Sequence, residues 1–248
     1  MTPRSEVFGR RSTAMLGLAG AILSGVGDVL ILGRPCSGRE FDAAAGRIPP
    51  NVDADPRWRS LWNGASFAPR RLRAGTFVGT VGIGVWQWVG LQAAARAIPP
   101  GRLHRLASIS AAAFALSGVL THLGCGTVIL AYRRAAERAA DAAGGQRSSP
   151  RSATTLLAVS ALGAFSALAV FSGAVFAAGL RGPESASRGL ALVTPFPCVL
   201  ATLLTFGALP APIGGYARPA SMSVGLAVYF GVRAASSREI IASSWSTR

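Results

Sequence analysis

The sequence contains no lysine, only ten acidic residues and only three cysteines. Charged residues make up 14% of the chain, well below the ~25% that is usual for soluble domains. The cysteines are isolated, and no two of them have the C-x-x-C spacing. This scarcity argues against a disulfide framework and against a structural zinc site.

Standard catalytic motifs are also missing. The sequence holds no G-x-S-x-G elbow, no H-E-x-x-H helix and no phosphate-binding glycine loop. Gly82 and Gly84 lie inside an apolar run, where they cannot follow a strand and open a nucleotide-binding helix. We therefore expect no metal, no cofactor and no catalytic residue of these types, and an enzyme is not the favoured class.

Apolar sequence is abundant. Half of the residues are hydrophobic, and the mean hydropathy is +0.41. A membrane-spanning helix needs about 20 predominantly apolar residues. Runs of about this length cover residues 13–33, 74–98, 106–132, 155–180, 189–209 and 219–235. They predict an all-α, polytopic membrane helix bundle with about six transmembrane helices, forming a single membrane-embedded domain over residues 1–248.

The positive charge is carried entirely by arginine. The 25 arginines outnumber the ten acids and give a net charge of +15, which in a soluble chain would suggest nucleic acid. Here they cluster in the links between apolar runs, as at Arg70, Arg71 and Arg73. Arginine in such links suits anionic lipid headgroups. We therefore expect a lipid bilayer with anionic headgroups as the partner, and no nucleic acid.

The first run also begins like an export signal, because Arg10 and Arg11 precede an apolar core. The run continues through Asp28 to Leu32 without a small-residue cleavage site. We therefore interpret it as a retained helix with a cationic flank.

Asp28 is the only acidic residue within the six runs. A central carboxylate costs membrane insertion about 2.5–3.5 kcal/mol, and each Leu, Ile or Val returns about 0.3–0.6 kcal/mol. Nine such residues lie between Leu16 and Leu32, so the helix can insert. A charge that faces lipid is rare, so Asp28 is expected to face other helices or a water-filled cavity.

Two kinds of residue could be the partner of Asp28, a histidine or an arginine. At 1.5 Å per residue, Asp28 lies ~8 Å and His122 ~15 Å from the same end of the predicted bundle. His122 is the only histidine within the runs, and arginines enter the second run at that end. The candidate ligand- or proton-binding residues are Asp28, His122, Ser24, Thr121, Cys125, Arg71 and Arg73.

Small residues repeat at intervals of three or four along the first three runs. They are Gly20 and Ser24 in the first run, Gly75, Gly79 and Gly82 in the second, and Gly118 and Gly126 beside His122 in the third. Small faces allow membrane helices to approach closely. The first three helices are therefore expected to pack around Asp28 and His122.

Two other segments carry structural signals. In the link over residues 34–73, Asp55 and Pro56 favour a helix start, and Trp58 and Trp62 recur at helical spacing. This predicts a short amphipathic helix at the membrane interface, serving as an anchor or as a lid. In the segment 133–154, the third helix should continue past its run by a turn or two and break at Gly144 and Gly145, since Ala, Glu and Arg favour helix.

Proline marks the fifth run. Pro195 and Pro197 stand in the sequence TPFPC near its start, and each lacks a backbone donor. We interpret them as a kink within the fifth helix, and broken membrane helices can also mark substrate sites.

The chain resembles an uncharacterised family of bacterial six-span integral membrane proteins known only as a domain of unknown function. The resemblance rests on Gly25, Gly27 and Asp28, on Arg70 to Gly79, on His122 and Gly124, and on the proline-rich segment from Pro195 to Gly215. It implies residence in a membrane, which for a bacterial protein of this kind is expected to be the cytoplasmic membrane, and no established activity.

Three functions are consistent with these residues. We favour a small-ligand or proton-linked carrier or sensor with an intramembrane polar site, because two ionisable groups among small-residue helices are typical of a cavity. One alternative is a structural membrane subunit in which the same groups only fix packing. A less favoured alternative is an intramembrane lipid-modifying enzyme, because few polar residues are available for catalysis.

Overall fold

The structure, a computed structural model, describes residues 3–44, 48, 56–141, 151–181 and 193–246. Within these ranges every element is helical. The elements are α1 (Pro3–Leu32), α2 (Gly38–Ala43), η1 (Pro56–Gly64), α3 (Pro69–Val81), η2 (Gly82–Gln87), α4 (Trp88–Arg96), α5 (Arg102–Asp141), α6 (Arg151–Arg181), α8 (Pro195–Phe206), α9 (Gly214–Ala217) and α10 (Ser221–Ser246).

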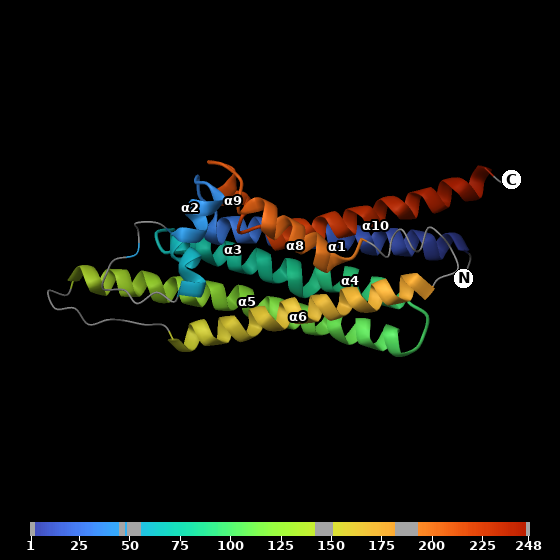
Figure 1. The fold of residues 1–248 in the computed structure, drawn as a ribbon, viewed down its shortest axis with the longest axis horizontal. Helices are drawn as coiled ribbons and strands as arrows, with labels where there is room; N and C mark the ends of the chain where they lie inside the picture. The colour runs from blue at the N-terminus through green and yellow to red at the C-terminus, as the bar shows by residue number, and fades with distance from the viewer. Residues whose placement is uncertain (1–2, 45–47, 49–55, 142–150, 182–192, 247–248) are drawn as a thin grey trace.

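The long helices lie side by side in an elongated bundle (Figure 1). Helix α1 packs against α3 and α10, α5 packs against α6, and α10 packs against α8. The elements α3, η2 and α4 follow one another directly and form one continuous helical rod. Its middle part, η2, is a π-helix. Helix α1 begins and α10 ends at the same end of the bundle (Figure 1).

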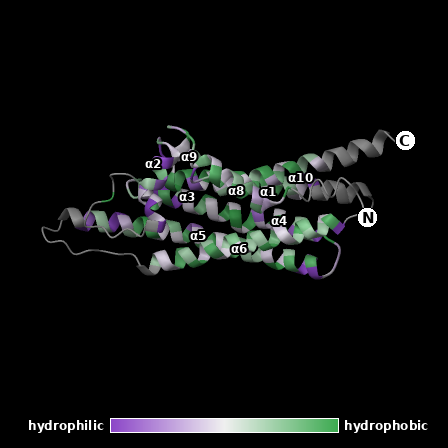
Figure 2. Ribbon diagram, viewed as in Figure 1, coloured by the Kyte–Doolittle hydropathy of each residue, from purple (hydrophilic) through white to green (hydrophobic). Residues whose placement is uncertain are grey.

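The outer surface of the bundle exposes large apolar side chains along its middle part. Phe77, Ile109, Leu162 and Leu204 are each between 68% and 71% exposed. Figure 2 shows apolar residues along the middle of the long helices, with many of the hydrophilic residues toward the ends. Apolar surface of this extent is rare on a soluble monomer.

Within the described residues, three helices are long and apolar enough to cross a membrane, over Arg11–Leu32, Arg102–Arg138 and Ala153–Arg181. They contain the predicted spans 13–33, 106–132 and 155–180, apart from the last residue of the first. The span predicted at 74–98 lies on the rod of α3, η2 and α4, and the span at 219–235 lies largely within α10. Helix α8 has only 12 residues, and residues 189–192 of the predicted fifth span are outside the described part. The count of six transmembrane helices stays a prediction.

The interior contains two apolar clusters separated by polar residues. One cluster includes Ala21 of α1 and Phe114 of α5, and the other includes Ile31 of α1 and Val128 of α5. Between these positions along the helices stand several polar side chains, which we call the polar layer. Its members on α1 and α5 are Ser24, Asp28, Thr121 and His122. We include Ser160 of α6 and Ser223 of α10, which contact Thr121 and Asp28, respectively.

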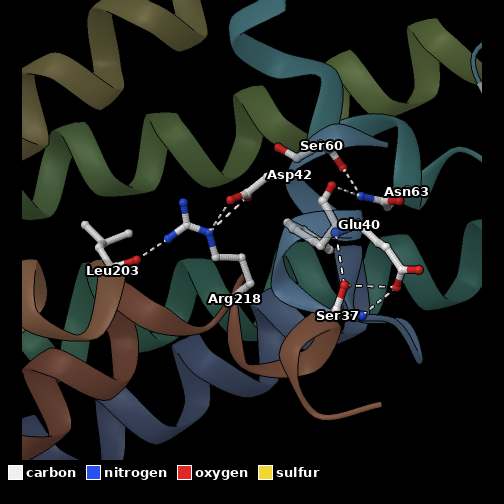
Figure 3. Close-up of polar contacts among 8 residues, drawn as sticks. Ser37, Glu40, Asp42, Ser60, Asn63, Leu203 and Arg218 are labelled. Carbon is white, nitrogen blue, oxygen red and sulfur yellow. Dashed lines mark hydrogen bonds and ion pairs between the residues drawn. The ribbon is translucent and has the colours of Figure 1, made fainter. Parts of the chain in front are cut away.

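One end of the bundle is closed by the links that follow α1 and α8. Backbone hydrogen bonds join residues 34–38 to residues 209–215, and α2 packs against α9. Arg218 binds the Asp42 carboxylate with its Nε at 2.9 Å and donates to the Leu203 carbonyl (Figure 3). The segment before α10 is thereby fastened to α2 and α8.

The predicted kink at Pro195 and Pro197 is wrong. Helix α8 begins at Pro195, because a proline in the first turn loses no intrahelical hydrogen bond and its fixed φ suits a helix start. Thr194 makes no side-chain cap. Instead, Ser172 of α6 accepts a 2.9 Å hydrogen bond from the Phe196 amide and caps the helix from a neighbouring element.

The segment predicted to lie at the interface is a 3-10 helix, η1, and it packs inward. Leu61 and Trp62 are buried, and the Trp62 ring lies 5.6 Å from that of Tyr132. Asp55, the expected cap, is outside the described residues. The predicted extension of the third helix is confirmed, since α5 continues to Asp141, and its predicted break lies outside the described residues.

Candidate functional site

Asp28 contacts two helices besides its own. Ser223 Oγ of α10 donates a 2.8 Å hydrogen bond to Asp28 Oδ2. His122 Nε2 of α5 lies 3.2 Å from Asp28 Oδ1, and the two side chains are 9% and 17% exposed, respectively. The imidazole N–H is not aligned with the carboxylate as a hydrogen bond requires, so this is a close acid–base contact.

Glycines bring these groups together. A Cβ on Gly27 of α1 would lie 2.7 Å from the Gly75 carbonyl and from the Gly79 backbone, so α1 and α3 cross at van der Waals contact. A Cβ on Gly79 would lie 2.2 Å from the His122 ring. The glycine face of α3 therefore serves both the helix crossing and the approach of His122 to Asp28.

Arginine does not fill the role of partner to Asp28. Arg71 donates to the carbonyls of Leu30, Val29 and Gly33 at distances of 2.8, 3.1 and 2.7 Å, and its guanidinium lies 3.6 Å from the centre of the Phe67 ring. Carbonyls at the end of a helix have no partner within it. A cation is favourable at a helix C-terminus, so Arg71 acts as the cap of α1.

The remaining predicted residues are distributed around this contact. Thr121 turns to α6, where its hydroxyl lies 3.2 Å from Ser160 Oγ, and it also donates to the Ser117 carbonyl at 2.8 Å. Cys125 is half-buried and follows His122 by three residues on α5. Arg73 is exposed.

Ser24 belongs to a second polar contact, one turn before Asp28. Its hydroxyl accepts a 2.9 Å hydrogen bond from Gln87 Nε2 and donates at 3.4 Å to the Gly79 carbonyl. Gln87 Nε2 also donates to the Gly20 carbonyl at 3.3 Å. Gln87 and Ser24 are both fully buried.

Sequence reasoning missed Ser223 and Gln87. Ser223 is one of many serines, and only the packing of α10 against α1 brings it to Asp28. Gln87 could have been predicted from the sequence to make a polar contact, because an amide inside an apolar run is costly to bury without partners.

The side chains at this site have the donors and acceptors that proton exchange or hydrogen bonding to a small polar molecule requires. A carboxylate, an imidazole and a hydroxyl meet between helices, and proton donors and acceptors of this kind mark relays in membrane proteins. Within the described residues no three His, Cys, Asp or Glu side chains form a group that could hold a metal ion.

The fold and the site together define an all-helical protein with helices of membrane-spanning length and a polar contact between them. The chain belongs to a family of unknown function (DUF6796), whose model matches residues 9–239. The expected membership of an uncharacterised family is thus confirmed. No curated protein and no solved structure matches the chain.

Proposed function

We propose that this protein is a multi-pass integral membrane protein in which Asp28 and His122 bind and release a proton. In this proposal the protein is a proton-linked carrier or sensor in the bacterial cytoplasmic membrane. The observation that carries the proposal is the 3.2 Å contact between His122 Nε2 and Asp28 Oδ1 in the polar layer.

The apolar exterior supports membrane residence. Large side chains such as Phe77 and Leu204 face outward along the bundle, and lipid tails would cover them at no desolvation cost. The arginines of the links would meet anionic headgroups, at about 1 kcal/mol for each one near the surface.

The chemistry of the pair supports proton binding. Histidine is the side chain whose charge most readily changes near neutral pH. A buried carboxylate is stabilised by an opposite charge and destabilised by burial alone. The pair therefore places a proton acceptor and a group that can donate a proton in direct contact between helices.

A structural role is the second candidate, and the Ser223 contact is the observation that favours it. Asp28 joins α1 to α10 through Ser223 and to α5 through His122. A polar clamp of this kind would hold three helices together without taking up a proton.

Infrared difference spectroscopy separates the two candidates. The full chain is reconstituted in liposomes and spectra are recorded between acidic and alkaline buffer. We expect a protonated-carboxyl band that disappears in Asp28→Asn and remains in Asp42→Asn, whose carboxylate lies in the end contact with Arg218. Absence of an Asp28 band at every pH at which the protein stays folded would leave only the structural role.

Membrane residence has its own test. The protein expressed in cells should remain in the membrane fraction after alkaline extraction and enter solution only with detergent. Recovery as a detergent-free monomer would contradict the proposal.

A further inference from the structure

Gln87 carries a buried acceptor that no described side chain or backbone group satisfies. Its amide nitrogen uses both hydrogens, one toward Ser24 Oγ and one toward the Gly20 carbonyl. Its Oε1 has no hydrogen-bond partner among the described residues, although the side chain is 0% exposed. Leaving such a group unpaired costs about 1–3 kcal/mol, so a donor from outside the chain is expected at this oxygen.

The π-helix η2 is the reason that Gln87 reaches α1. Gly82 faces α1, since a Cβ on Gly82 would lie 2.6 Å from Ser24 Oγ and 2.7 Å from the Gly20 carbonyl. In a regular α-helix with about 3.6 residues per turn, the next residue after Gly82 on the same face would be near position 86. The wider turn of η2 shifts the register by about one residue and brings Gln87 to Ser24. Single π turns are frequent at functional sites.

Ser24 contacts the amide of Gln87 and precedes Asp28 on α1. Ser24 and Asp28 are one turn apart on α1, a rise of ~6 Å. A single water that makes hydrogen bonds of ~2.8 Å to two oxygens spans ~5.5 Å between them. The hydrogen bond from Ser24 Oγ to the Gly79 carbonyl is long, at 3.4 Å, so the hydroxyl is able to turn toward such a molecule.

We propose that Gln87 Oε1 and Ser24 Oγ bind a water molecule that also hydrogen-bonds Asp28 and delivers its proton. When Asp28 is protonated, a hydrated proton at this position gives one proton to the carboxylate and becomes neutral water. Release is the reverse step. The proposal rests on the proposed function, because it presumes that Asp28 takes up a proton. Buried waters typically join polar groups that lack protein partners.

The test measures how fast the Asp28 carboxyl exchanges its proton for deuterium after mixing with D2O, followed by its infrared band. Gln87→Met keeps the length of the side chain but removes the acceptor. We expect exchange about tenfold slower than in the unmodified protein, since losing one hydrogen bond on the exchange path raises the barrier. Ser24→Ala, a smaller change, should have the same effect.

Two controls make the result specific. Gln92 of α4 donates to the Ser108 carbonyl at 2.9 Å, away from Asp28, and Gln92→Met should exchange at the unmodified rate. Gln87→Glu in its neutral form keeps one donor and one acceptor, so it should restore fast exchange.

The outcomes distinguish the two proposals. If the unmodified protein has no Asp28 carboxyl band, the proposed function fails. If the band is present but Gln87→Met and Ser24→Ala exchange at the unmodified rate, only the water site is overturned. Equal slowing in Gln92→Met, or slow exchange in Gln87→Glu, also overturns the water site.

Discussion

Gly79 leaves the space that the His122 imidazole occupies. A Cβ at this position would stand 2.2 Å from both Cδ2 and Nε2 of the ring, well inside van der Waals contact. The His122 ring can therefore lie beside Asp28 only because residue 79 of α3 is a glycine and has no Cβ.

Gly79→Ala should displace the imidazole and separate it from Asp28. We expect a loss of about 1–3 kcal/mol in the free energy of unfolding, as for other overpacked interiors, measured in mixed detergent micelles. A Cβ on Gly173 of α6 would have no neighbouring atom within 4 Å, so Gly173→Ala should be neutral or stabilising. An equal loss in both variants would contradict this account of Gly79.

Asp28 and His122 should be energetically coupled. In a double-mutant cycle with Asp28→Asn and His122→Gln, we expect a coupling of about 0.5–3 kcal/mol in the free energy of unfolding, since the residues are in contact. The more exposed pair of Arg133 and Glu137 is also in contact, at 2.9 Å, and should give only about 0.3–0.5 kcal/mol. Additive effects at Asp28 and His122 would show that their proximity has no energetic consequence.

Substitution of Arg71 should destabilise the fold much more than substitution of Arg73, although the sequence makes both residues candidates for the same site. Arg71→Ala removes three hydrogen bonds to the end of α1, and we expect a loss of about 1–3 kcal/mol in the free energy of unfolding. Arg73 is exposed, so Arg73→Ala should change it by less than about 0.5 kcal/mol. Equal effects of the two substitutions would refute the role of Arg71 as a cap.

The start of α2 should respond to acid. The Ser37 amide donates to Glu40 Oε2 at 2.8 Å and the Ser37 hydroxyl at 3.0 Å, and these bonds lower the pKa of Glu40. Because the pKa is lower in the folded state, the stabilising contribution is complete above the unfolded-state pKa. It is lost as the pH falls through the folded-state value.

Nuclear magnetic resonance of the Ser37 amide can follow this change. Its chemical shift should move as Glu40 is protonated, and in Glu40→Gln it should stay constant over the same pH range. Gln is a suitable control because it also serves in a capping box. A constant Ser37 shift in the unmodified protein would contradict the prediction.

Local rules predict the helices better than their ends. The apolar runs predict α1, α5 and α6 correctly, because a run of that length has few alternatives. The same rules predict a kink at Pro195, although the lack of a backbone donor also suits the first turn of a helix. Whether Pro195 kinks a helix or begins one depends on Ser172, which caps α8 from α6. No local pattern in α8 reveals this contact.

Residue identity alone establishes that one acid and one histidine stand within the six apolar runs. Only the tertiary structure decides whether His122 or an arginine is the neighbour of Asp28. Arg71 is long enough for either role, and its donors go to the end of α1. Ser223 and Gln87 join the polar contacts for a related reason. Periodicity gives the face of one helix, whereas the rotation of helices against each other, and the π turn of η2, follow from packing.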